Sequence, residues 1–144
     1  MMMLMHMQCR IRPTTRNTDE IWDNIKVLIC PSVWHEAWGI IVTEAQLRGI
    51  PVIASDAGGL VEAKIGLPYT VPVRMVTGAR DPETGYYIVP RQDITPWART
   101  LEHIMSNREE YMALSELTVK RSVEWLMGMD PCAHEKWLLS MMRR

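Results

Sequence analysis

The chain has 144 residues, of which 47% are hydrophobic and 23% charged, a composition typical of a globular domain rather than of a disordered or fibrous protein. The formal net charge is -1 and the basic residues form no stripe, so nucleic acid is not an expected partner. The methionine-rich start does not read as a secretory signal, and no segment has the roughly 18 consecutive apolar residues of a membrane span. We therefore expect a cytoplasmic protein. Its three cysteines, Cys9, Cys30 and Cys132, have no zinc-type spacing, so no metal site is predicted.

Residues 1–16 are predicted to be an irregular N-terminal segment, and residues 17–144 a single α/β domain. A helix cap at Asn17 starts a short helix that ends near Asn24. The apolar run Lys26–Cys30 is closed by proline, which suits a strand of a parallel sheet covered on both faces.

The next segments complete a strand–helix–strand unit. Residues 40–48 favour a helix that ends at Gly49, the residue type most often found at a left-handed helix cap. Residues 50–54 then form a second apolar run, which predicts a buried strand. Because the links are short, the two strands are expected to be parallel neighbours joined by the helix.

The rest of the chain changes from loop to helix. The Gly58-Gly59 pair is predicted to open a short helix, and a long extended stretch leads to a third strand at 86–89. Three further helices are predicted after Thr95-Pro96, Asn107 and Asp130-Pro131, each a recognisable helix start.

Both glycine-bearing loops follow predicted strands. Ligands of parallel α/β sheets bind at the carboxyl ends of the strands, where helix N-termini present free N–H groups. In PSVWHEAWGIIVTE, residues 31–44, Gly39 allows a tight turn, so that the amides of Trp38, Gly39 and Ile40 could face an anion or a hydroxyl. The Gly58-Gly59 loop could do the same after the second strand.

Two carboxylates in this stretch are candidate ligand groups. Glu36 lies in the loop and Glu44 about one turn inside the following helix, so both can face one crevice and accept hydrogen bonds from vicinal hydroxyls of a sugar. Glu44 could instead pair with Arg48 four residues later. His35 is a second candidate acid or base. Trp34 and Trp38 could either wall the pocket or pack as ordinary core aromatics.

The segment PSVWHEAWGIIVTEAQLRGIPVIASDAGGLVEA resembles the donor-site region of the family-four (group 1) glycosyltransferases, and the likeness extends over about residues 17 to 126. The resemblance implies a partial Rossmann-like α/β fold with a small parallel sheet and a helical C-terminus. It also implies that Glu36 contacts the transferred sugar, that the backbone of residues 37–40, from Ala37 to Ile40, holds sugar hydroxyls and diphosphate, and that Glu44 binds the ribose. A UDP- or GDP-sugar would be the donor substrate, and no cofactor is required.

A complete member of that family is more than twice this long, so the chain resembles a truncated C-terminal, donor-binding part. The strand at Lys26–Cys30 would then lack a neighbour, and we expect a homodimer or a partner chain to cover this edge and the C-terminal helix around Trp137. Three functions remain open. The chain could be a retaining transferase completed by another polypeptide, a repurposed cyclase- or isomerase-type enzyme using Glu36 or His35 on a hydrophobic metabolite, or a noncatalytic binding subunit.

Overall fold

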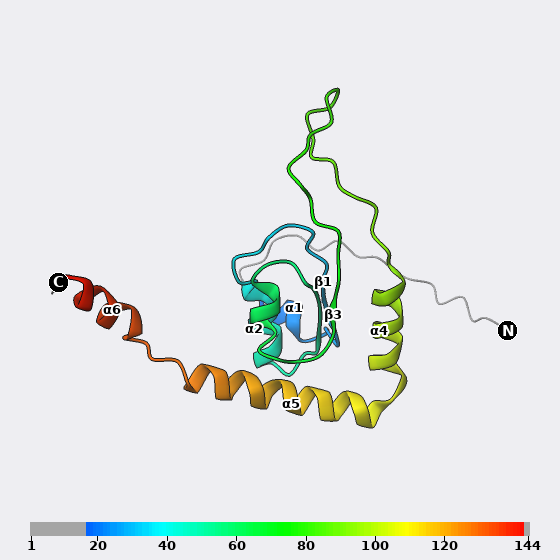
Figure 1. Ribbon diagram of the computed structural model, residues 1–144. Coiled ribbons are helices and arrows are strands. Elements are labelled where there is room, and N and C mark those ends of the chain that lie inside the picture. The colour runs from blue at the N-terminus through cyan, green and yellow to red at the C-terminus, as the bar shows by residue number, and fades with distance from the viewer. Residues whose placement is uncertain (1–16, 143–144) are drawn as a thin grey trace.

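A computed structural model describes residues 17–142, so the predicted irregular segment 1–16 lies outside the described residues. The described chain has a three-stranded parallel sheet in the order β1-β2-β3, with helices on both faces and a helical C-terminal part (Figure 1). The predicted α/β, partial Rossmann-like fold class is therefore confirmed. Residues 17–144 as one domain stay a prediction.

The strands are β1 (Leu28–Cys30), β2 (Val52–Ser55) and β3 (Thr70–Val71). Leu28 pairs with Val52 and Ala54 with Thr70, which makes β2 the central strand and β1 an edge strand. All four residues of β2 are buried, as predicted for a strand covered on both faces. The same prediction was wrong for β1, where Ile29 is 41% exposed, because α4 packs on β2.

The third strand is not where the sequence pattern placed it. Thr70–Val71 forms β3, whereas residues 86–89 belong to a long arm that projects from the body (Figure 1). In this arm the chain turns at Asp81, and Tyr87 pairs back with Arg80 in a single antiparallel bridge. The side chains at 86–89 are exposed, so their apolar character does not reflect a place in the sheet.

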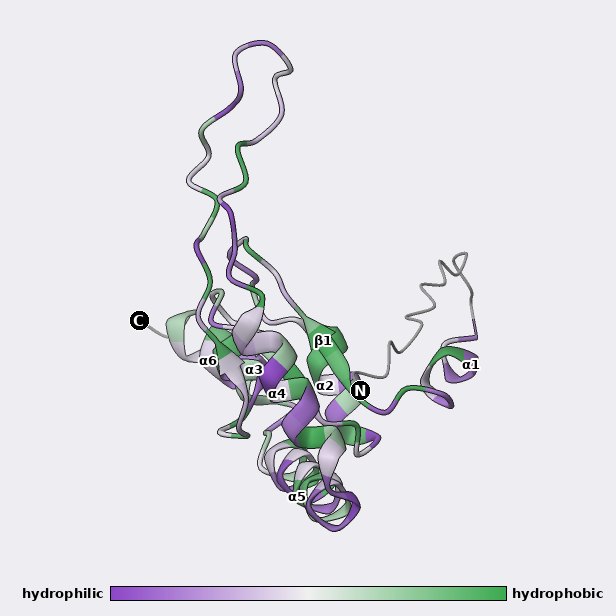
Figure 2. Cartoon of the chain, turned by 90° about the vertical axis from the view of Figure 1, so that its right-hand side faces the viewer, coloured by the Kyte–Doolittle hydropathy of each residue, from purple (hydrophilic) through white to green (hydrophobic). Residues whose placement is uncertain are grey.

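Two apolar clusters lie on the two faces of β2, because successive side chains of a strand point to opposite sides. On one face Val52 and Ala54 pack with residues of α1 (Asp19–Trp22), α2 (Ile40–Leu47) and α3 (Leu60–Ala63). On the other face Ile53 packs with Ile104 of α4 (Thr95–Ser106). The edge strand β1 is also coloured hydrophobic in Figure 2.

The three helices predicted after position 95 are all present. Asn107 caps α5 (Arg108–Met127) by accepting hydrogen bonds from the amides of Glu109 and Glu110. Helix α5 packs against α2, where the Ser115 hydroxyl donates to the carbonyl of Gly49 at 2.6 Å. None of the residues of α6 (Ala133–Met142) is buried, and Figure 1 shows this helix set apart from the sheet.

Candidate functional site

The two glycine-bearing loops are joined main chain to main chain at the carboxyl ends of β1 and β2. The amide of Gly59 donates to the carbonyl of Glu36 at 2.7 Å, and Glu36 and Gly58 form a parallel bridge. Gly58 has a φ of +59°, and a Cβ at this position would lie 2.7 Å from the Glu36 carbonyl oxygen. A Cβ on Gly59 would overlap the carbonyl group of Ala37. Both glycines are therefore required by this close approach, and the Gly59 amide is already occupied.

Two serines hold the first loop in place. Ser55, the last residue of β2, donates through its hydroxyl to the carbonyl of Ser32 at 2.6 Å. The Ser32 hydroxyl in turn lies 3.1 Å from both Glu36 Oε1 and the carbonyl oxygen of Trp34, and its single proton is donated to one or shared between the two. This chain of contacts orients the Glu36 carboxylate from the end of the neighbouring strand. Neither serine was predicted to have a role, although a small hydroxyl residue lies two positions after β1 and at the last position of β2.

The side chains of Glu36 and His35 are both exposed, beside the contact between the two loops. Burial raises the pKa of the Cys30 thiol at the end of β1, and the negative charge of Glu36 raises it further. The exposed Glu36 carboxylate is available to an incoming ligand, while Ser32 restricts its orientation.

The first loop leads through Trp38 and Gly39 into the N-terminus of α2, which begins at Ile40. Gly39 has a φ of +80° directly before the helix, and a Cβ there would overlap the side chain of Leu60. Within residues 17–142, no hydrogen bond occupies the N–H groups of Trp38, Gly39 or Ile40. These groups can donate to a ligand, and the helix dipole favours a negative charge in front of them.

Glu44 lies in the second turn of α2 and is half-buried. Its predicted alternative partner is engaged elsewhere, because the Arg48 guanidinium forms an ion pair with Asp19 at 3.0 Å. Arg48 contacts Glu44 only through the backbone, donating to its carbonyl at 3.1 Å. Among the described residues, the Glu44 carboxylate has no ion pair.

The two tryptophans of the loop have different partners, so they do not form one aromatic wall. Trp34 contacts the ring of Tyr87 in the arm, with ring centroids 5.2 Å apart. Trp38 stacks on Trp125 of α5 at 5.3 Å, and its indole N–H donates to the Thr43 hydroxyl at 2.9 Å. Neither Tyr87 nor Trp125 was expected from the sequence. Each contact joins positions far apart in the chain and leaves no local pattern.

The fold and the joined loops define an α/β protein whose strand ends carry glycine-turned backbone and a carboxylate. Residues 11–65 match the family model described as glycosyl transferases group 1, so this stretch of the chain is similar to that family. The resemblance is confirmed over the stretch that holds Glu36, Glu44 and the Gly58-Gly59 pair, whereas the likeness expected beyond residue 65 stays a prediction. No curated protein and no solved structure matches the chain.

Two further properties bear on the class of site. Within residues 17–142, no three His, Cys, Asp or Glu side chains are grouped so that they could hold a metal ion. The helices in the same part of the chain are all too short or too polar to cross a bilayer.

Proposed function

We propose that the joined loops bind a nucleotide sugar, with a UDP- or GDP-sugar as donor substrate, and that the chain is a glycosyltransferase-like protein. The observation that carries the proposal is the hydrogen bond from the Gly59 amide to the Glu36 carbonyl, which joins the loop that contains Glu36 and the free amides of residues 38–40 to the loop after β2. A nucleotide sugar offers a diphosphate for the amides and hydroxyls for the carboxylate. The family match over residues 11–65 supports the same class of ligand.

Each group has a role that follows from its chemistry. The Ser32-oriented carboxylate of Glu36 would accept hydrogen bonds from the transferred sugar and stabilise positive charge at its anomeric carbon. The backbone from Ala37 to Ile40 would hold the diphosphate, because the N-terminus of α2 is a favourable place for an anion. Glu44, one turn further on, would accept from the ribose hydroxyls. His35 is the neighbouring candidate for proton transfer.

Sugar transfer with retention of configuration also needs an acceptor held in place and water excluded. We propose that a second copy of the chain supplies part of this enclosure by covering β1 and α6. The exposed side chain of Ile29 on β1 and the 55% exposed Trp137 on α6 support this pairing. Sedimentation at micromolar concentration should show a dimer, and a monomer that still binds nucleotide would contradict the pairing without affecting the donor site.

Calorimetric titration of the full chain with UDP-glucose and GDP-mannose tests donor binding. Glu44→Ala should weaken binding of the preferred donor about tenfold or more, because it removes charge-assisted hydrogen bonds to the ribose. Glu102→Ala, an exposed glutamate on α4, is the matched control and should leave the affinity unchanged. Absence of binding to every UDP- and GDP-sugar would overturn the proposal.

The contact between Trp34 and Tyr87 favours a second candidate function. Both rings are partly exposed. Trp34 lies two residues before Glu36 in the chain, and Tyr87 contacts the ring of Trp34. An apolar metabolite that binds against these rings could therefore lie beside an acid or base. Such a cyclase- or isomerase-type enzyme would bind no nucleotide. Its turnover would be lost in Glu36→Gln, whereas Glu44→Ala would leave it intact.

A further inference from the structure

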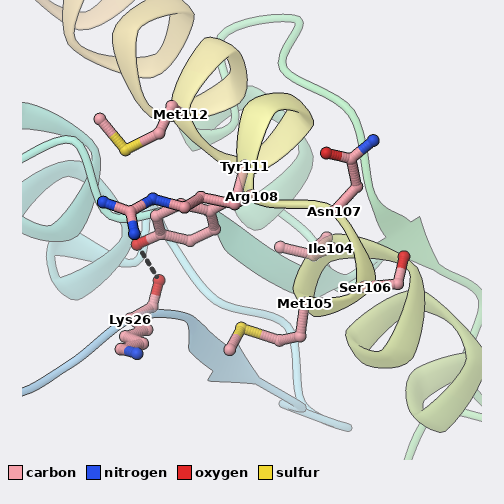
Figure 3. Close-up of a pocket in the computed structure, with 8 residues that line it drawn as sticks. All are labelled: Lys26, Ile104, Met105, Ser106, Asn107, Arg108, Tyr111 and Met112. Carbon is pink, nitrogen blue, oxygen red and sulfur yellow. Dashed lines mark hydrogen bonds between the residues drawn. The ribbon is translucent and has the colours of Figure 1, made fainter.

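A second candidate site lies near the amino end of β1. An open cavity of about 510 Å³ is lined by residues at the junction of α4 and α5 and by Lys26, which precedes β1 (Figure 3). Glu36 follows β1, so the two sites lie at opposite ends of this strand. The volume is within the range of small-molecule pockets, roughly 300–1,000 Å³. Nothing in the proposed donor site uses it.

The apolar part of the cavity comes from three side chains of the two helices. Ile104 is 3% exposed and also belongs to the cluster on this face of β2. Met105 of α4 and Met112 of α5 line the cavity and are about half-exposed. Methionine side chains are flexible and polarisable, so they adapt to apolar groups of different shapes. These residues favour an apolar portion in the ligand.

The charged part of the cavity is entirely positive. Lys26 and Arg108 line it, and no carboxylate of the described residues does so. Neither cation takes part in an ion pair within residues 17–142. A guanidinium and an ammonium at one cavity suit a phosphate or carboxylate, which the guanidinium can bind through two parallel hydrogen bonds.

The other polar groups of the lining are already engaged within the protein. Tyr111 donates through its hydroxyl to the carbonyl of Lys26 at 2.9 Å, the dashed contact in Figure 3. The Asn107 side chain accepts from the first turn of α5, and the Ser106 hydroxyl donates to the carbonyl of His103. The two cations are therefore the groups left to bind a ligand, and the occupied helix N-terminus contributes little.

We propose that this cavity binds a small amphiphilic anion, a phosphate monoester or similar group that carries an apolar chain. The anionic group lies between Lys26 and Arg108, and the chain packs on Ile104 and the two methionines. Such a ligand is either free in solution or part of the headgroup region of an anionic lipid. The site is separate from the loops that bind the nucleotide sugar, so Glu44→Ala does not alter it.

Titration of the full chain with n-hexyl phosphate, inorganic phosphate and 1-hexanol separates the two parts of the ligand. Hexyl phosphate should bind, and each of the other two at least about tenfold more weakly, since each lacks one of the two contacts. Arg108→Gln and Lys26→Gln should each weaken hexyl phosphate about tenfold, the size expected for a charge-assisted hydrogen bond. Arg91→Gln, an exposed arginine outside the cavity, is the matched control.

Cosedimentation with phosphatidylcholine vesicles, with and without phosphatidic acid, identifies the source of the ligand. Binding of hexyl phosphate in solution indicates a free ligand. Binding only to phosphatidic acid vesicles, lost in Arg108→Gln, indicates a lipid headgroup. Binding to neither probe overturns the proposal, as does an affinity that Arg108→Gln and Lys26→Gln leave unchanged. Equal affinities for hexyl phosphate and inorganic phosphate overturn the apolar part.

Discussion

The amide of Gly59 donates a hydrogen bond of 2.7 Å to the carbonyl oxygen of Glu36. This bond joins the loop after β1 to the loop after β2, and the bridge between Glu36 and Gly58 adds a second link. The candidate carboxylate is therefore held by the end of a neighbouring strand rather than by its own loop alone. A substitution in the loop after β2 should therefore change the position of Glu36 in the loop after β1, and with it the affinity for a ligand.

Substituting the glycine of this joint tests the coupling. Gly59→Ala places a methyl group against the Ala37 carbonyl, so the loops must separate, and we expect a loss of about 1–3 kcal/mol in the free energy of unfolding. Nucleotide-sugar affinity should fall as well. Gly128→Ala is the control, because its φ is -79° and the nearest atom to the added Cβ is 3.4 Å away. Equal unfolding free energies for both variants would show that the joint is not constrained.

Lys64 gives the protein a dependence on pH. Its side chain is 3% exposed and donates to the carbonyl of Val52, and burial lowers the pKa of its ammonium from 10.5 to about 8. Below pH 8 the group is charged in both the folded and unfolded states, and the folded state is destabilised by about 3 kcal/mol. Between about pH 8 and 10.5 only the unfolded state retains the proton, so the free energy of unfolding rises with pH.

Urea unfolding of wild type and Lys64→Met between pH 7 and 10.5 measures this effect. Met keeps much of the side-chain volume without the charge. The free energy of unfolding of wild type, relative to that of Lys64→Met, should therefore rise by up to about 3 kcal/mol as the pH rises. Lys120→Met, at an exposed position of α5, should show no such change. Parallel curves for wild type and Lys64→Met would mean that Lys64 keeps its ordinary pKa.

The stacked rings of Trp38 and Trp125 should be energetically coupled. A double-mutant cycle with Trp38→Leu and Trp125→Leu is expected to give a coupling free energy of about 0.5–1.5 kcal/mol, since the rings stack at 5.3 Å. The control cycle pairs Trp34→Leu with Trp125→Leu, which have no ring contact among the described residues, and should give a coupling within about 0.5 kcal/mol of zero. Equal coupling in both cycles would contradict the stacking.

The reactivity of Cys30 reports the position of the Glu36 charge. Burial and this carboxylate both raise the pKa of the thiol, so Glu36→Gln should lower the pKa and speed alkylation by iodoacetamide at pH 8 about two- to threefold. The assay uses a chain with Cys9→Ser and Cys132→Ser, so that only Cys30 reacts. Glu44→Gln is the control. An unchanged rate in Glu36→Gln would show that the carboxylate lies further from the strand end.

The parts of the fold that local chemistry determines could be predicted from the sequence. Asn107 predicts a helix start because its side chain accepts from free amides of the first turn, and it does so in the structure. Gly49 predicts the end of α2 because its φ of +72° is unfavourable for other residues. The continuous apolar run at residues 50–54 predicts a buried strand because a strand covered on both faces needs apolar side chains on both, and all four residues of β2 are buried.

The features that failed or were missed depend on contacts between distant segments. Residues 86–89 have the composition of a strand, but Thr70–Val71 pairs with β2 and leaves them in the arm. Arg48 pairs with Asp19, 29 residues away, instead of with Glu44 on its own helix. The same limit applies to the site, where the sequence predicts Glu36 and the glycines. It does not show that Trp38 turns away to stack on Trp125.

The most direct test of the proposed donor site is an NMR titration of the backbone amides with the UDP- or GDP-sugar that binds best. The largest shifts are expected at residues 36–40 and 58–59, where the joined loops meet the N-terminus of α2. The amides that line the cavity between α4 and α5 should not move. No shift in the joined loops, or shifts confined to other surfaces, would contradict the assignment of the nucleotide-sugar site.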